Sequence, residues 1–146
     1  MYNFEYQQAK SVADASATLP WCFAEEATAA TEALLDRLRT GETAVVPAHW
    51  PTEVVNGLIM AMRRSRIDLE RVTRFARDLA ALPIRIEPPH SPVTWSALIR
   101  VAGEHHLTAY DAAYLELAQR TGLPLATLDD DLRKAALAAG VALVET

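Results

Sequence analysis

The 146-residue chain has one cysteine, five glycines and few aromatic residues (7%). The single cysteine, Cys22, excludes an internal disulfide and a four-cysteine zinc site. No segment matches the fingerprints GxGxxG or GxxxxGK[ST], which argues against dinucleotide-dependent redox chemistry and P-loop hydrolysis. No apolar run approaches the ~20 residues of a membrane-spanning helix, and the first residues lack the basic and apolar parts of a signal peptide. We therefore expect a cytoplasmic protein with no membrane association.

Basic residues are outnumbered, with 14 Lys and Arg against 19 Asp and Glu, for a formal net charge of −5. This balance argues against a protein held on nucleic acid by bulk charge alone, but not against an enzyme that acts on nucleic acid through bound metal. Hydrophobic residues make up 51% of the chain, so it can bury the core of one ordinary domain. We expect that domain at residues 11–146, preceded by an extension at residues 1–10.

Short apolar runs alternate with amphipathic stretches, which is the pattern of a parallel sheet covered by helices. The predicted strands are residues 11–14, 43–46, 84–86 and 125–128, with a fifth at 141–144. The predicted helices are residues 28–39, a segment that starts at residue 52, and residues 69–82, 93–106, 109–120 and 130–139. The pattern therefore predicts a single α/β domain with a central, mainly parallel sheet of four to five strands.

Four acidic residues take equivalent places in this layout. Asp14 and Asp129 lie at the carboxyl ends of predicted strands, and Glu53 and Asp111 lie near the starts of predicted helices. Ligands bind outside the carboxyl ends of the strands in such sheets, so we expect the four carboxylates to converge. Two unit charges about 4 Å apart repel by roughly 4 kcal/mol at an effective dielectric near 20. Convergence therefore requires a shared proton or a divalent cation, and oxygen-only ligands suit Mg²⁺ or Mn²⁺.

Each of these acids also has a purely structural explanation when it is taken alone. Asp14 and Asp129 would cap the turns that follow them, and a first-turn acid such as Glu53 or Asp111 is favoured at a helix start. The functional interpretation depends on all four at one sheet edge. A hard cation held by carboxylates, with open positions for water and phosphate, is suited to phosphodiester hydrolysis.

Four segments, in order along residues 11–144, resemble the motifs of PIN-domain ribonucleases of the VapC type. They are residues 14–16 with 21–26, residues 47–56, residues 107–118 and residues 125–129. The resemblance implies a three-layer α/β/α fold and an endoribonuclease that depends on Mg²⁺ or Mn²⁺. It also implies the toxin of a toxin–antitoxin pair, expected as a homodimer that a cognate VapB-like antitoxin silences.

The resemblance assigns roles only to residues that match the motifs. The catalytic residues would be Asp14, Glu53, Asp111 and Asp129. The metal ligands among them would be Asp14, Asp111 and Asp129. The supporting residues would be Asn56, Thr127 and Asp131. The alternative that stays open is a non-catalytic metal- or protein-binding module on the same fold.

Six arginines stand between residues 63 and 78 against three acids, a local net charge of +3. They fit a surface that binds an RNA backbone beside the acidic cleft. They also fit a solvated helix face with pairs such as Glu70–Arg74, or a surface for an acidic partner. The histidines show no metal-ligand spacing, and we expect surface roles for all four: His49, His90, His105 and His106.

Overall fold

The computed structural model describes residues 8–144. Its centre is a parallel four-stranded sheet in the order β3-β2-β1-β4. The strands are β1 (Ala9–Ala13), β2 (Thr43–Val46), β3 (Ile84–Ile86) and β4 (Leu125–Ala126). The predicted α/β class and parallel sheet are confirmed, with four strands.

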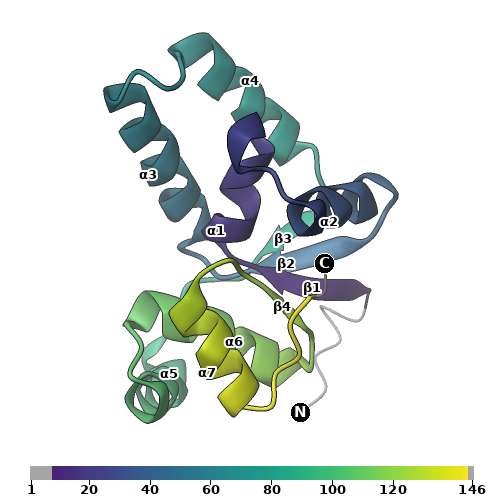
Figure 1. The fold of residues 1–146 in the computed structure, drawn as a ribbon. Coiled ribbons are helices and arrows are strands. Elements are labelled where there is room, and N and C mark those ends of the chain that lie inside the picture. Colours follow the sequence, from purple (N-terminus) through teal and green to yellow (C-terminus); the bar gives the residue numbers. More distant parts are fainter. Residues whose placement is uncertain (1–7, 145–146) are drawn as a thin grey trace.

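Helices cover both faces of this sheet, which gives the expected three layers (Figure 1). On one face lie α1 (Ala15–Thr18), α2 (Ala29–Arg39), α3 (Trp50–Arg63) and α4 (Leu69–Ala80), with the short 3-10 turns η2 (Leu19–Trp21) and η3 (Ala24–Glu26). On the other lie α5 (Pro92–His105), α6 (Ala109–Thr121) and α7 (Asp130–Ala138). No helix among residues 8–144 is long and apolar enough to cross a membrane.

The central strands are shielded on both faces, which explains their continuous apolar sequence. Val12, Val45 and Val46 have no exposed surface. Below the sheet, α6 packs its buried residues 112–118 against β1 and β4, and α5 and α7 pack against α6. The same strand packing holds the carboxyl ends of β1 and β4 side by side.

Two expectations at the end of the sheet are wrong. Residues 141–144 form no strand within the described part of the chain, and only an isolated bridge joins Leu143 to Leu125. Strand β4 also ends at Ala126 and not at residue 128. The backbone turns there because Thr127 bonds Asp14 and Asp129 caps α7. Because β4 has only two residues, residues 141–144 find too few backbone partners to form a hydrogen-bonded strand beside it.

Two other boundaries differ from the sequence pattern. Helix α3 begins at Trp50, two residues earlier than expected, and Pro51 suits its first turn because a proline lacks only an N–H that would be unpaired there. Strand β1 begins at Ala9, inside the segment expected to be an extension. Residues 1–7 lie outside the described residues, so the domain boundary stays a prediction.

A half-buried ion network ties α6 to the segment that follows β3. The Arg120 guanidinium donates to both carboxylate oxygens of Glu87 and, through Nε, to Glu116 Oε2 at 2.9 Å. Burial alone would lower the pKa of Arg120, but the two carboxylates outweigh it and hold that pKa above its usual value. The Glu87 contacts therefore join the last turn of α6 to the segment after β3.

Candidate active site

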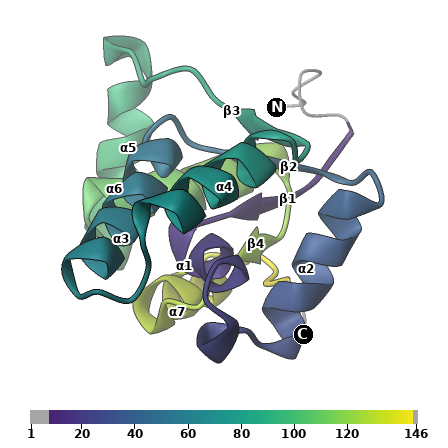
Figure 2. The same cartoon turned by 90° about the horizontal axis from the view of Figure 1, so that it is seen from above.

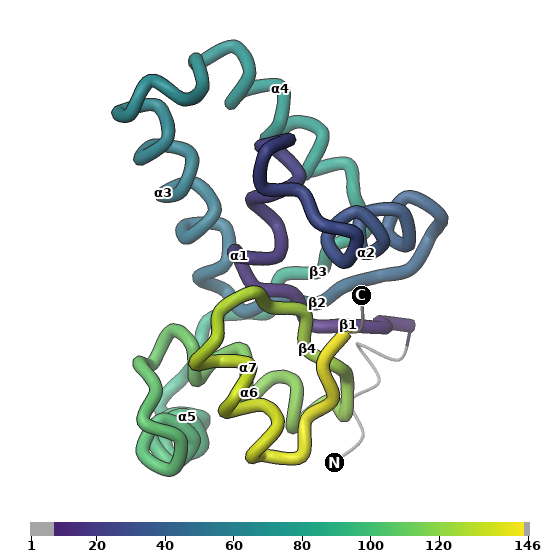
Figure 3. The backbone as a smooth tube through the Cα atoms, in the orientation of Figure 1, coloured from purple at the N-terminus to yellow at the C-terminus, as the bar shows by residue number. Residues whose placement is uncertain are grey.

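Asp14 lies at the point where the strand order reverses. Strand β1 pairs with β2 on one side and β4 on the other, and ligands bind at such a switch point in α/β sheets. Asp14 follows β1 directly, is 5% exposed and caps α1. In Figure 3 the segment that joins β4 to α7 passes beside the start of α1. The predicted site therefore stands at the expected edge of the sheet.

Three donors hold the Asp14 carboxylate. Ser16 Oγ and the Ala17 N–H donate to Oδ1 at 2.7 and 3.0 Å, and Thr127 Oγ1 donates to Oδ2. Burial raises the pKa of Asp14 to about 6, although these donors lower it and the nearby Glu53 raises it further. The predicted supporting role of Thr127 thus has a structural basis, since its hydroxyl group orients Asp14.

Ser16, which contacts Asp14, was not among the site residues predicted from sequence. Its hydroxyl group also accepts the Leu128 N–H at 2.8 Å, so it joins α1 to the segment after β4. Its place in the first acidic motif, two residues after Asp14, could have identified it as a site residue. Ser16 therefore couples the orientation of Asp14 to the backbone that carries Asp129.

Glu53 lies in the first turn of α3 and accepts a hydrogen bond from Tyr114, a residue of α6 that is 1% exposed. Burial alone would raise the pKa of Glu53, but His49 and the Tyr114 hydroxyl group outweigh it and hold that pKa below its usual value. Glu53 therefore favours the ionised form, with its carboxylate held between two helices.

His49 lies beside this carboxylate and is only partly exposed, unlike the surface position expected for it. Its Nε2 is 3.4 Å from Glu53 Oε1 but makes no hydrogen bond within the described residues. Its ring packs against Tyr114 and Tyr110, at centroid distances of 5.1 and 5.5 Å. The four-residue spacing from His49 to Glu53 at the start of a helix was the signal for this contact.

Asp111 and Asp129 complete the group of four acids. Burial raises the pKa of Asp111, repulsion from Asp129, Glu53 and Asp131 raises it further, and His49 lowers it in part. Asp129 caps α7 by accepting the Leu132 N–H at 2.8 Å and is otherwise exposed. Glu53 thus interacts electrostatically with both Asp14 and Asp111, and Asp129 interacts with Asp111.

Two of the supporting candidates are less involved in this site. Asn56 is exposed on the next turn of α3 after Glu53, and its side chain makes no hydrogen bond within the described residues. Asp131 is exposed in the first turn of α7 and affects Asp111 only through its charge. Their roles stay predictions.

The donor chemistry of the site fits a hard divalent cation. Asp14 and Asp111 offer carboxylate oxygens, and their pKa values are raised by burial and by neighbouring carboxylates, which His49 offsets only in part at Asp111. Such oxygens are the ligands that Mg²⁺ and Mn²⁺ prefer. Within residues 8–144, however, no three His, Cys, Asp or Glu side chains lie close enough together to hold a metal ion. Complete coordination would therefore need water, substrate oxygens or side-chain movement.

The raised pKa of Asp14 predicts a pH-dependent stability. Because the folded-state pKa, about 6, lies above the unfolded value near 3.8, ionisation of Asp14 destabilises the folded state. In metal-free buffer we expect the unfolding free energy to fall as the pH rises from about 4 to about 7, by up to about 3 kcal/mol. Urea denaturation checks this, with Asp14→Asn as the reference that lacks this component. Parallel pH profiles for the two proteins would contradict it.

The sequence of this chain is similar to a known protein family and to a named relative. The family model described as PIN domain matches residues 11–137. Ribonuclease VapC12, from two strains of Mycobacterium tuberculosis, is 35% identical over 105 residues, which cover 72% of this chain and 78% of that protein.

Two solved structures share the fold. A crystal structure of PAE2754 from Pyrobaculum aerophilum has a TM-score of 0.68 and 27% identity, covering 91% of this chain and 85% of its own. A toxin–antitoxin complex from Klebsiella pneumoniae has a TM-score of 0.55 and 18% identity, covering 82% of this chain and 87% of its own. Together with the family match and the identity to a VapC ribonuclease, the fold shows that this chain belongs to the PIN-domain family, as a member of the VapC type.

Proposed function

We propose that this protein is an endoribonuclease that hydrolyses RNA phosphodiester bonds with the help of Mg²⁺ or Mn²⁺. The observation that carries the proposal is the buried Asp14 carboxylate at the switch point, electrostatically coupled to Glu53 and within a group of four acids. Carboxylates that stand together at this edge suit a cation and a phosphate group. The relationship to a protein named as a ribonuclease supports the same activity.

In this proposal Asp14, Asp111 and Asp129 hold the metal, directly or through water. When bound, a divalent cation polarises a phosphoryl oxygen and lowers the pKa of coordinated water. Glu53 orients the attacking water and accepts its proton, because Tyr114 and His49 favour its ionised form. Asp129 shares this role or completes the metal shell.

The supporting residues act on these carboxylates. Thr127 and Ser16 keep both oxygens of Asp14 in one orientation through their hydrogen bonds. Asp131 adds negative charge near Asp111, which strengthens the attraction for a cation. Asn56 is exposed one turn beyond Glu53, where it can donate to a bound RNA strand.

We also propose that the protein acts in the cytoplasm as the toxin of a toxin–antitoxin pair, silenced by a VapB-like antitoxin. Its family membership supports such a partner. A homodimer is supported by the apolar side chains that α5 leaves exposed: Val93, Trp95 and Ile99 are 87%, 54% and 71% exposed. A second copy of the chain would cover this face and remove it from water.

Incubation of the purified protein with total RNA tests the activity and its metal dependence. We expect discrete fragments with Mg²⁺ or Mn²⁺ and intact RNA with EDTA, because the four carboxylates repel a phosphate when no cation is present. Asp111→Asn in the same assay should leave the RNA intact. Intact RNA in every lane, with Mg²⁺ binding still detectable, would favour the non-catalytic module instead.

A further inference from the structure

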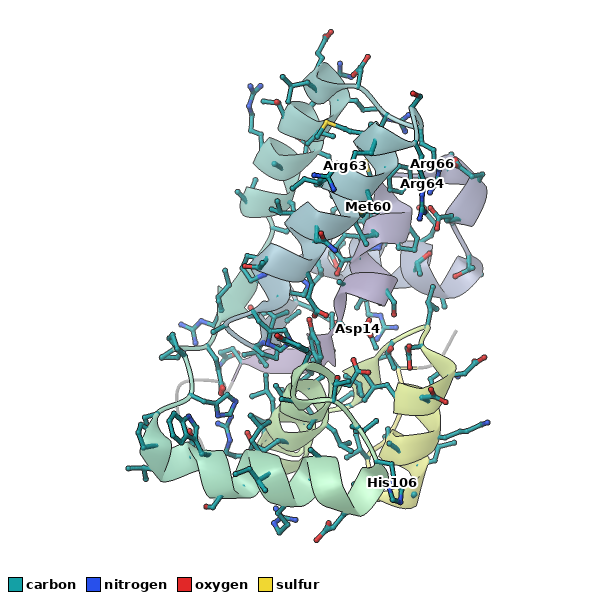
Figure 4. The ribbon with its side chains drawn as sticks, turned by 90° about the vertical axis from the view of Figure 1, so that its left-hand side faces the viewer. Asp14, Met60, Arg63, Arg64, Arg66 and His106 are labelled. Carbon is teal, nitrogen blue, oxygen red and sulfur yellow. The ribbon has the colours of Figure 1, made fainter. Side chains whose placement is uncertain are left out.

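One side of α3 connects the acidic site to a basic end. Glu53, Asn56, Met60 and Arg63 follow each other at intervals of three and four residues, so they lie along one side of the helix. Arg64 caps the same helix directly after Arg63. Ten residues of α-helix span about 15 Å, so the two arginines lie about that far from the Glu53 end. Figure 4 shows them at the end of α3 away from Asp14.

Three of the other arginines in this region have structural partners. Arg66 Nη2 donates to Glu25 and Glu26 at 2.7 and 2.9 Å, and its guanidinium lies 4.5 Å from the Phe23 ring centroid. Arg71 Nη2 donates to the Cys22 carbonyl oxygen at 2.7 Å, and this hydrogen bond links α4 to the segment after η2. Arg74 is 3.3 Å from Glu70, as the spacing predicts. These contacts account for half of the six arginines.

The remaining three, Arg63, Arg64 and Arg77, have no such partners among the described residues; Arg77 lies on α4, whereas Arg63 and Arg64 are adjacent at the end of α3. Both are exposed, and neither forms an ion pair within the described residues. Among the described residues, the only side-chain hydrogen bond of Arg63 is from Nη1 to Met60 Sδ at 3.9 Å. The helix macrodipole favours a cation in the last turn, but it does not require two adjacent cations with no anion between them. Two free guanidinium groups in this position suit a bound phosphate, which they contact through paired hydrogen bonds.

We propose that Arg63 and Arg64 form a phosphate-binding site for the backbone of a single-stranded RNA that runs along α3 from the acidic site. This inference rests on the proposed nuclease function and specifies how the substrate is held. The site contacts phosphates a few nucleotides away from the reacting bond. It therefore contributes affinity and salt dependence and takes no part in the bond cleavage itself.

RNA binding in an Asp14→Asn background tests this site without cleavage of the probe. The probe is a fluorescein-labelled oligouridine of about 12 nucleotides, followed by fluorescence anisotropy at several salt concentrations. Adding Arg63→Gln and Arg64→Gln together should weaken binding by roughly tenfold at about 0.1 M salt. The slope of log K against log salt should shrink by about 0.7 for each arginine removed.

The matched control removes two positive charges elsewhere. Arg37→Gln with Arg39→Gln changes α2, which Figures 1 and 2 place on the opposite side of the molecule from α3. We expect its affinity and salt slope to stay close to those of the parent. Equal weakening by both pairs would overturn the proposal, because net charge alone would then explain the effect.

Two further outcomes would also overturn the proposal. One is an unchanged affinity and salt slope in the variant that lacks Arg63 and Arg64. These arginines would then be candidates for binding an acidic protein surface and not RNA. The other is a parent protein that does not bind the probe at all. Binding as expected, together with no cleavage of any RNA by the wild-type chain, would reject the nuclease and retain the phosphate site. The two proposals can therefore fail separately.

Discussion

Asp14→Asn is expected to reduce the rate of RNA cleavage by at least about a hundredfold, because loss of one group that stabilises charge in a transition state typically costs about 10²–10³ in kcat. Asn retains a carbonyl oxygen but has no negative charge to hold a cation. Gel analysis of RNA fragments over time, with Mg²⁺ present, measures the change. The effect should lie mainly in kcat, since the proposed contacts of Arg63 and Arg64 with the RNA backbone are unchanged.

The fold should survive this substitution. The Asn side chain has the same shape, and its carbonyl oxygen can still accept from Ser16 and from the Ala17 N–H. The Thr127 hydroxyl group can rotate to accept from the new amide group. Because a buried charge is removed, the variant should be more stable than the wild type above about pH 6, by up to about 3 kcal/mol in metal-free buffer. Loss of activity with unchanged or increased stability would separate catalysis from folding.

Asp36→Asn is the matched control for this experiment. Asp36 is an exposed acid on α2, 3.8 Å from Arg39, and its replacement removes the same charge far from the site. We expect full cleavage activity and a change in unfolding free energy of less than about 0.5 kcal/mol. Cleavage that persists in both Asp14→Asn and Asp111→Asn would rule out the acidic-site mechanism.

Arg120→Met is expected to destabilise the protein by about 3 kcal/mol. Its side chain is 34% exposed, while those of its partners Glu116 and Glu87 are only 9% and 12% exposed. Removing the shared cation leaves two nearly buried carboxylates without a counter-charge, and breaking a buried pair in this way typically costs about 3–5 kcal/mol. The lower end applies because Arg120 is partly in water. Thermal unfolding should show a midpoint lowered by about 10 °C.

Two comparisons isolate the cause of this destabilisation. Arg100→Met breaks an exposed pair with Glu104, 3.4 Å away on α5, and should cost less than about 0.5 kcal/mol. Glu87→Gln with Glu116→Gln, added to Arg120→Met, should recover much of the lost stability, because no unpaired charge then remains. If Arg120→Met costs no more than Arg100→Met, the network does not hold α6 in place.

The local pattern of the sequence predicted the strands and helices closely. Strands β2 and β3 begin and end where the apolar runs do, and α2 and α6 begin after Thr28 and Thr108, which cap them. These features depend on neighbouring residues alone. The predicted fifth strand failed for the opposite reason. Residues 141–144 are apolar enough for a strand, but their pairing depends on how many residues the distant β4 leaves free.

The candidate site also has features that local sequence predicts and features that depend on distant residues. Asp14, Glu53, Asp111 and Asp129 could be found from sequence because each stands at a strand end or a helix start, and a parallel sheet brings those ends to one edge. Their roles as metal ligands and catalysts stay predictions. What the pattern could not provide was the contacts that orient them. Tyr114 reads as an ordinary core aromatic in α6, and its bond to Glu53 crosses 61 residues of sequence.

The sequence by itself therefore determined the class of fold and the strand ends and helix starts at which the four acids stand, since charge, periodicity and capping are local properties. Only the tertiary structure decided which partners surround each group. It placed Thr127 against Asp14, 113 residues away, and His49 beside Glu53. It also separated the arginines with structural partners from Arg63 and Arg64, which remain exposed. These contacts depend on strand order and helix packing, because strand order and packing bring together side chains that are far apart in the sequence.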